Sequence, residues 1–181
     1  MQTRAIEFAI VRSSLGDLLV AASEKGICHV RFAEPGVDLA GELARELPFA
    51  ALRENPARLR PWTDALLRYV EGRSALAEIP LDVSGSRFER RVWAALREIP
   101  RGETRTYSEV ADWLGEPKSA RAVGRACASN PVALATPCHR VVARNGKLGG
   151  YRWGLERKRA LLRRESMERT QSLPATLPLP L

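Results

Sequence analysis

A cysteine and a histidine stand side by side in the segment Pro137-Cys138-His139-Arg140-Val141-Val142. The segment lies between an apolar run and a strand-like pair of valines. A thiolate is a strong nucleophile, and a nearby imidazole can accept the proton of the thiol. Neighbouring residues of an extended segment point in opposite directions, however, and most cysteines only pack. Cys138 is therefore a candidate nucleophile that needs support from other parts of the chain.

The cysteines and histidines of the whole chain give no sign of a disulfide framework or a metal site. Cys28, Cys127 and Cys138 form an odd set without paired spacing, and with His29 and His139 they match no zinc motif. Unpaired cysteines favour a reducing compartment, so we expect a cytoplasmic protein. We expect no metal and no cofactor, because nucleotide-loop motifs are missing as well. No apolar run approaches a membrane span, and residues 5–11 are typical of a strand rather than a signal segment.

The first 80 residues predict a small α/β scaffold. Three strands are expected over residues 6–11, 18–22 and 27–32, the last two as an antiparallel hairpin. One helix follows from the spacing of Leu39, Leu43 and Leu47, and Pro61 is expected to open another that ends at Gly72. Alternation in the third strand places Cys28 in the core with Val30 and Phe32 and leaves His29 solvated.

The second half, residues 81–166, changes to a helical period after a linker at Ala75–Ser86. Ser86 and Glu89 form a capping box for a helix that Pro100 and Gly102 close. Ser108 is expected to cap a short helix ending at Gly115, and a third helix starts at Ser119. Helix, short turn with glycine and helix together predict a helix-turn-helix. The proline-rich residues 167–181 are expected to form a flexible tail.

The excess of positive over negative charge lies entirely in the second half. Residues 1–80 carry ten basic and eleven acidic side chains, whereas residues 81–181 carry nineteen and ten. Twenty-five of the 29 basic residues are arginine, which pairs with phosphate and stacks on bases. Charge alone leaves two interpretations open, a polyanion such as nucleic acid as partner or a solvated arginine-rich surface.

The third helix of this half, Ser119–Ser129, contains unusually small residues. They are Ala120, Ala122, Gly124, Ala126 and Ala128. Glycine inside a helix costs about 1 kcal/mol relative to alanine, so Gly124 needs a reason. Arg121 and Arg125 share its face and would suit even a minor groove of roughly 6 Å width. Tight packing on neighbouring helices is the alternative. Cys127 is expected in the core.

Several motifs, taken together, resemble the O6-alkylguanine-DNA alkyltransferases in order and spacing. The motifs are Thr106-Tyr107-Ser108, Ala120-Arg121-Ala122-Val123-Gly124, Ser129-Asn130-Pro131, Pro137-Cys138-His139-Arg140-Val141-Val142, Gly150-Tyr151-Arg152-Trp153-Gly154 and Leu162-Arg163-Arg164-Glu165. The resemblance is close over residues 86–166 and looser over 1–80, nearest to the alkyltransferase half of the bacterial adaptive-response protein. It implies an α+β fold: an N-terminal ribonuclease-H-like domain with a small antiparallel sheet, then a mostly helical, winged-helix-like domain with a helix-turn-helix.

The resemblance also implies a chemistry. Cys138 would take the alkyl group from O6-alkylguanine, and also from O4-alkylthymine, in double-stranded DNA after the damaged nucleotide is flipped out. His139 would activate the thiol through a water, oriented by Glu165 at the end of the helix Leu155–Glu165. Tyr107 would relieve the leaving guanine of charge, and Asn130 would brace the active-site turn. The product is a thioether at saturated carbon, so each monomer would react once and irreversibly, without a cofactor.

The same resemblance assigns two further sets of residues. The DNA-binding set is Arg121, Tyr107, Ala122, Gly124, Arg125 and Ser129. The substrate-pocket set is Val141, Val142, Tyr151, Arg152 and Trp153. Some relatives carry a small residue where Arg152 stands, so this position bears on the width of the pocket.

Two other function classes remain to be separated from alkyl transfer. A non-catalytic DNA-lesion binder, as in alkyltransferase-like proteins, would lack the reactive cysteine that Cys138 supplies. A cysteine hydrolase using Cys138 and His139 would turn over, and it leaves the helix-turn-helix and the basic second half without a role. Alkyl transfer is the interpretation that uses all of these features.

Overall fold

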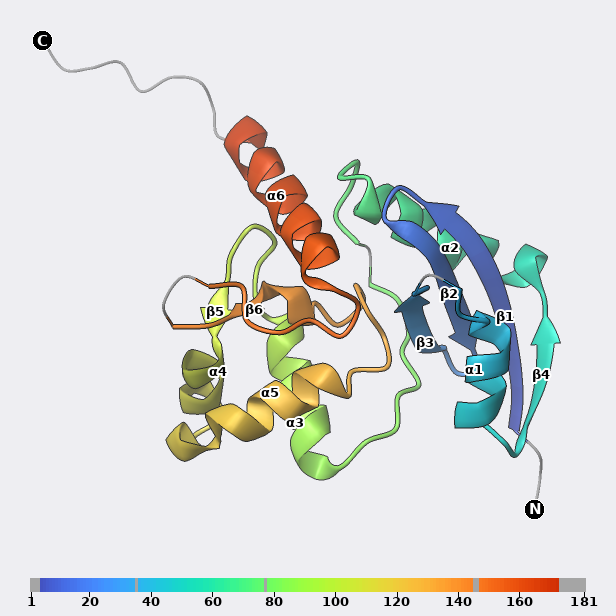
Figure 1. Cartoon of the computed structure of the whole chain (residues 1–181), viewed down its shortest axis with the longest axis horizontal. Helices are drawn as coiled ribbons and strands as arrows, with labels where there is room; N and C mark the ends of the chain where they lie inside the picture. Colours follow the sequence, from blue (N-terminus) through green and yellow to red (C-terminus); the bar gives the residue numbers. More distant parts are fainter. Residues whose placement is uncertain (1–3, 35, 77, 145–146, 173–181) are drawn as a thin grey trace, which may run out of the picture.

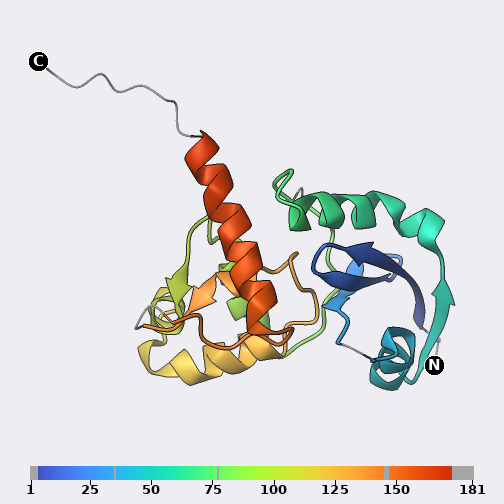
Figure 2. The same cartoon turned by 45° about the horizontal axis from the view of Figure 1, so that its top comes forward.

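The computed structural model describes residues 4–34, 36–76, 78–144 and 147–172, and it consists of a sheet-containing half and a helical half (Figure 1). The long C-terminal helix α6 (Leu155–Ser172) rises beside the junction of the two halves (Figure 2). No helix among the described residues is long and apolar enough to cross a membrane.

The first half is built on a four-stranded sheet in the order β3-β2-β1-β4. β1 (Arg4–Ser13), β2 (Gly16–Ala22) and β3 (Ile27–Phe32) form an antiparallel meander, which contains the predicted hairpin of the last two strands. β4 (Ala50–Glu54), which was not predicted, pairs parallel with β1. The predicted antiparallel sheet therefore carries one parallel edge strand.

Helices cover both faces of this sheet (Figure 2). α1 (Leu39–Glu46) packs Leu39 and Leu43 on one face, and α2 (Pro56–Val70) packs Leu59 and Leu66 on the other. The prediction that Pro61 opens the second helix is wrong. Asn55 caps α2 by accepting from the Arg58 N–H, with Pro56 at the first helical position, so Pro61 lies inside the helix.

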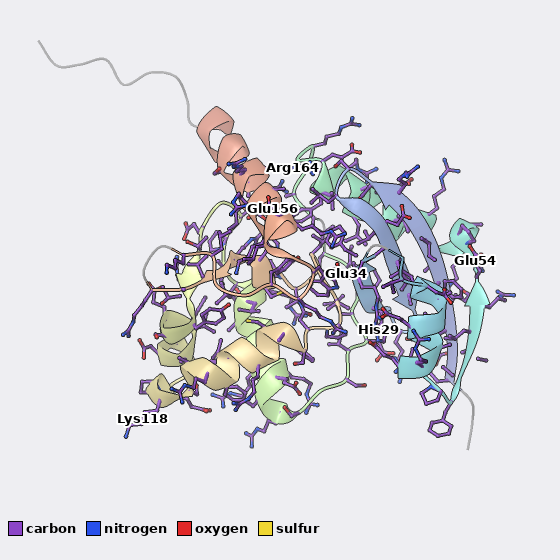
Figure 3. The ribbon with its side chains drawn as sticks, in the orientation of Figure 1. His29, Glu34, Glu54, Lys118, Glu156 and Arg164 are labelled. Atoms are coloured by element: carbon purple, nitrogen blue, oxygen red, sulfur yellow. The ribbon has the colours of Figure 1, made fainter. Side chains whose placement is uncertain are left out.

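A β-bulge in β3 corrects two further predictions. Ala21 pairs with His29 and Ala22 with Ile27, so Cys28 is the extra residue of the bulge. Cys28 is buried as predicted, but it packs with Leu39 and Leu43 of α1 rather than sharing a face with the later residues of β3. His29, labelled in Figure 3, is not solvated: its side chain is 12% exposed, because α1 covers that face and brings Glu46 to 3.5 Å.

The helical half contains α3 (Arg87–Arg97), α4 (Tyr107–Trp113) and α5 (Ala120–Ala128), the last preceded by the 3-10 turn η1 (Pro117–Ser119). The capping box of Ser86 and Glu89 is present as predicted. α4 is capped by Thr106 with Glu109, not by Ser108, because the helix begins two residues earlier than expected. β5 (Arg105–Thr106) pairs parallel with β6 (Val141–Val142) beside these helices.

α6 also differs from expectation. The predicted helix ends at Glu165, whereas α6 continues to Ser172 through the first six residues of the predicted tail. The prolines that motivated the tail begin only at Pro174, so residues 167–172 contain no helix breaker. Residues 173–181 lie outside the described residues.

The free edge of β3 receives two segments that come later in the chain. The Ile27 N–H donates to the Pro80 carbonyl (2.8 Å), and the Val30 N–H donates to the Pro131 carbonyl (2.9 Å). The Ala133 N–H returns a bond to the Val30 carbonyl at 2.9 Å. The loop leading to Cys138 is thereby fixed to the N-terminal sheet.

Candidate active site

Cys138 opens the 3-10 turn η2 (Cys138–Arg140) and is only 4% exposed. The Asn130 side chain holds it: Nδ2 donates to Cys138 Sγ at 3.2 Å and to the Thr136 carbonyl at 2.9 Å, and Oδ1 accepts from the Val132 N–H at 3.0 Å. Burial raises the pKa of Cys138 to about 11, against the hydrogen bond from Asn130 and the charge of Lys158. The resting group is therefore a thiol, and a reaction requires a base.

The loop that carries Cys138 contains a left-handed residue that is not glycine. Leu134 has φ 70° and is 2% exposed. This conformation costs a side-chain-bearing residue about 1 kcal/mol or more, and it persists where surrounding contacts over-determine it. Those contacts are the bonds of Asn130 inside the loop and of Val30 outside it.

His139 is fully buried beside Cys138, and its Nε2 lies 2.8 Å from Glu165 Oε1. Although burial acts to raise it, hydrogen bonds from His139 and Arg140 hold the pKa of Glu165 well below its usual range. The carboxylate is thus ionised and accepts a proton-bearing Nε2, which leaves the lone pair on Nδ1. Nδ1 has no hydrogen-bond partner among the described residues. Burial lowers the pKa of His139 despite Glu165, so the imidazole is a neutral base.

Two residues that the sequence did not point to complete the surroundings of Glu165. Arg140 Nε donates to Oε2 at 3.0 Å and its Nη1 to the Ile99 carbonyl at 2.6 Å. The hydroxyl of Tyr69, from α2, donates to Oε1 at 2.5 Å. We call Glu165, His139, Arg140 and Tyr69 the Glu165 cluster. Tyr69 and Glu165 are 96 residues apart in the sequence, so no local sequence pattern connects them.

Lys158 is a third residue that sequence reasoning missed. It is fully buried on α6, and its Nζ donates to the Val141 carbonyl (2.6 Å) and the Gly150 carbonyl (3.0 Å). Burial lowers its pKa to about 8. Lys158 joins β6 to the loop after it and places a positive charge that favours the Cys138 thiolate. A lysine at helical spacing among other basic residues gave no signal in the sequence.

A cavity of about 260 Å³ opens on Cys138. Its lining includes Tyr107, Gly124, Cys127, Cys138, Tyr151 and Arg152. Burial raises the pKa of Tyr107, so this phenol keeps its proton. A Cβ on Gly149, which has φ 69°, would lie 2.9 Å from the Tyr107 hydroxyl, so only glycine permits this close approach. Cys127, predicted in the core, is 9% exposed and borders the cavity.

The predicted substrate-pocket residues separate into two groups. Tyr151 and Arg152 line the cavity, whereas Val141, Val142 and Trp153 are not among its lining residues. Trp153 is 4% exposed and packs edge-on against Tyr151 at 5.3 Å. The Arg152 guanidinium lies 3.3 Å from Glu46 of α1 and over the Trp153 ring. Arg152 therefore lies at the cavity wall but is directed toward the N-terminal half.

Of the predicted DNA-binding residues, four lie on α5, Ser129 is its C-cap, and Tyr107 opens α4. The side chains of Arg121 and Arg125 are exposed and make no hydrogen bond or ion pair with any residue of the described structure. A Cβ on Gly124 would meet nothing closer than the Tyr107 ring at 3.8 Å, so internal packing does not require this glycine. Ala122 is half-buried, and Ser129 donates to Glu89 Oε1 at 2.6 Å. In the described parts of the chain, no group of three metal-binding side chains occurs.

Comparison with known proteins connects both halves to one family. The family model for the DNA binding domain of 6-O-methylguanine DNA methyltransferase matches residues 87–167, and that for its ribonuclease-like domain matches residues 6–83. A methylated-DNA--protein-cysteine methyltransferase of Mycolicibacterium paratuberculosis is 42% identical over 96% of this chain and 98% of its own length. The bifunctional transcriptional activator/DNA repair enzyme Ada of Escherichia coli is 41% identical, and the chain spans about half of it (46%).

A solved structure is similar over most of the chain. The OGT of Mycobacterium tuberculosis in complex with DNA is 36% identical, with a TM-score of 0.77 over 90% of this chain and 93% of that one. The matched segments cover the sheet-containing half and the helical half in turn. This chain therefore belongs to the 6-O-methylguanine DNA methyltransferase family.

Proposed function

We propose that this protein repairs DNA by transferring the alkyl group of O6-alkylguanine to Sγ of its own Cys138. One observation carries the proposal: a buried thiol faces a cavity of about 260 Å³ and has a neutral histidine, oriented by an ionised glutamate, beside it. A nucleophile, a base and an orienting carboxylate are the parts that such a displacement requires. The family membership supports the same reaction.

The proposed reaction is a displacement at saturated carbon. His139 Nδ1 accepts the Cys138 proton through a bridging water, and the thiolate attacks the alkyl carbon. As the S–C bond forms, the C–O6 bond breaks and its electron pair passes to the guanine. Tyr107 gives its phenolic proton to the leaving base, and the proton held by His139 replaces it through solvent. The thioether has no acyl carbon for water to attack, so each molecule reacts once.

We propose that α5 enters the duplex, with Arg121 filling the gap left by the extruded nucleotide. Arg125, Ala122, Gly124 and Ser129 would contact the DNA around it. O4-alkylthymine is proposed as a second substrate of the same cavity. The division into residues 1–80 and 81–166 and the cytoplasmic location also stay proposals, the latter supported by three free cysteines.

The decisive experiment incubates the protein with duplex DNA that contains one labelled O6-methylguanine, followed by peptide mapping. We expect one methyl group on Cys138 and none on Cys28 or Cys127, because of these three buried thiols only Cys138 accepts a side-chain N–H, from Asn130, and lies beside the His139–Glu165 pair. A lesion binder would retain the DNA without gaining label. A cysteine hydrolase would show turnover, with more than one product per protein.

A further inference from the structure

Tyr69 belongs to the N-terminal half, but its hydroxyl lies inside the Glu165 cluster. The residue is 2% exposed, and its hydroxyl lies 2.5 Å from Glu165 Oε1, 3.2 Å from His139 Nε2 and 3.3 Å from Arg140 Nη2. Its ring packs edge-on to the imidazole at 6.4 Å and beneath the Arg101 guanidinium at 4.7 Å. One side chain of α2 therefore contacts all three other members of the cluster.

We propose that Tyr69 is a positioning residue for alkyl transfer, which fixes the orientation and the tautomer of His139 through Glu165. The inference rests on the proposed function, because it assigns a role in the same reaction. It also gives the N-terminal half a direct part in the chemistry, beyond that of a scaffold.

The hydrogen-bond directions around Tyr69 lead to this role. An ionised carboxylate only accepts, so the single hydroxyl proton of Tyr69 is directed to Glu165 at the shortest of the three distances. The oxygen of Tyr69 is then left as an acceptor between two donors, Arg140 Nη2 and His139 Nε2–H. A proton on Nδ1 instead would set the Nε2 lone pair against both Tyr69 and Glu165. The hydroxyl thus favours the tautomer whose Nδ1 is a base.

The Tyr69 hydroxyl also competes with His139 for the Glu165 carboxylate, because both donate to Oε1. The groups that face His139 are Glu165 and Lys158 from α6, Arg140 and Cys138 from η2, Tyr69 from α2, and the Tyr151 ring edge-on at 6.4 Å. Without the Tyr69 proton, Glu165 would bind the imidazolium more strongly. The pH below which His139 is protonated, and alkyl transfer fails, would then move upward.

The test is Tyr69→Phe in the full chain, with the free base O6-benzylguanine as substrate so that DNA binding plays no part. The rate constant for benzyl transfer at neutral pH is expected to fall about tenfold to a hundredfold, the range for one buried hydrogen bond to a charged group. The acid limb of the pH profile is expected to shift to higher pH. In a Glu165→Gln background, Tyr69→Phe should add less than about threefold, because the two residues act as one unit.

Arg164→Gln is the matched control. Arg164, labelled on α6 in Figure 3, bonds to the Val70 carbonyl and to Ser14 and so joins the same two helices one residue away from the cluster. It should leave the pH profile unchanged. Equal losses in Tyr69→Phe and Arg164→Gln, an unshifted profile, or full multiplicativity with Glu165→Gln would each overturn the role.

A measurement on the unmodified protein tests the tautomer without any variant. The chain has two histidines, so imidazole ¹⁵N shifts can be assigned to His29 and His139 directly. We expect His139 to carry its proton on Nε2, and a proton on Nδ1 would overturn the inference even if Tyr69→Phe failed to fold. A wild-type chain that takes up neither a benzyl group from the free base nor a methyl group from O6-methylguanine DNA would overturn the proposed function itself and, with it, this role.

Discussion

Behind Cys138, the polar groups of the Glu165 cluster are buried and bonded to one another, whereas the arginines of α5 in front of it stand exposed. Glu165 accepts from four groups, the side chains of Tyr69, His139 and Arg140 and the Gly102 N–H at 3.2 Å. The guanidiniums of Arg121 and Arg125 have no partner among the described residues. The polar groups of the first region find their hydrogen-bond partners within the protein. The exposed guanidiniums of the second region are available to bind a polyanion.

This contrast between buried and exposed polar groups matches two requirements of the proposed reaction, proton transfer and DNA binding. Groups that must hold a proton in one place are preorganised in a water-poor interior, where electrostatic interactions are strong. Groups that must meet many DNA sequences stay solvated, and they can pair with phosphates wherever the chain binds. Substitutions on the two sides should therefore fail in different assays.

Removing the nucleophile gives the largest expected effect and separates the two regions completely. Cys138→Ala should abolish methyl transfer from O6-methylguanine DNA while leaving DNA affinity within about twofold, because the thiol lies at the bottom of the cavity and contributes no charge to binding. Mass analysis and a binding titration check the two parts. Cys127→Ala, at the cavity wall, should keep the transfer. Label on the Cys138→Ala protein would contradict the assignment.

Removing the Glu165 carboxylate tests how much the Glu165 cluster contributes to the stability of the fold. Glu165→Leu leaves the Arg140 guanidinium buried without its partner, so the free energy of unfolding should fall by about 3 to 5 kcal/mol. Urea titration measures it. The control Glu156→Leu removes an exposed pair with Arg159 on the same helix and should cost less than about 1 kcal/mol (Figure 3).

The stability difference between wild type and Glu165→Leu should also depend on pH. The folded pKa of Glu165 lies below the ordinary value of 4.5, so its contribution to stability is complete above that pH. The contribution is lost as the pH falls from there through the depressed folded pKa. The stability difference between wild type and Glu165→Leu should therefore shrink in acid. A difference that stayed constant down to strongly acidic pH would show that Glu165 is not the ionised partner described here.

Arg121→Ala tests the role of the exposed arginines by comparing two substrates, duplex DNA and a free base. If its guanidinium stabilises the extruded nucleotide, the variant should repair duplex DNA at least about tenfold more slowly and react with free O6-benzylguanine at nearly the wild-type rate. Single-turnover rates with both substrates provide the check. Equal losses of rate on the two substrates would show that Arg121 acts in the chemical step. The exposed and buried regions would then not have separate roles.

Arg125→Ala should have the smallest effect. Neutralisation of about four to six phosphates predicts that log affinity for duplex DNA falls with log salt at a slope of about −3.5 to −5.5, and the variant should make it shallower by up to about one unit. Unrelated duplexes should weaken by similar factors, as for a backbone contact. An unchanged slope would show that Arg125 does not contact phosphate.

Local patterns predicted most elements and the motif residues, but not the contacts that close the site. The three main strands, the Ser86 capping box and the small-residue helix follow from alternation and capping chemistry in short windows. The bulge at Cys28 and the inclusion of Pro61 in α2 depend on pairing and packing that such windows do not contain.

The resemblance named Cys138, His139 and Glu165, and the structure brings them together. Tyr69 and Lys158 were missed for the same reason as the bulge. A tyrosine on an amphipathic helix and a lysine among arginines look like ordinary packing and surface residues until the chain folds. The sequence predicts only a scaffold for the N-terminal half, because the contribution of this half to the site is a single hydroxyl, 96 residues away from the carboxylate that it contacts.

The attachment of the Pro131–Ala133 segment to β3 bears on solubility. Strand edges with free N–H and C=O groups invite pairing with other molecules, and here the edge of β3 is occupied by the chain's own loop and by the Pro80–Asp82 segment. The opposite edge, β4, is only five residues long and carries Arg53 and Glu54. A substitution that loosened the loop, such as one at Asn130, would uncover the apolar strand Ile27–Phe32, and such variants should precipitate as well as lose activity.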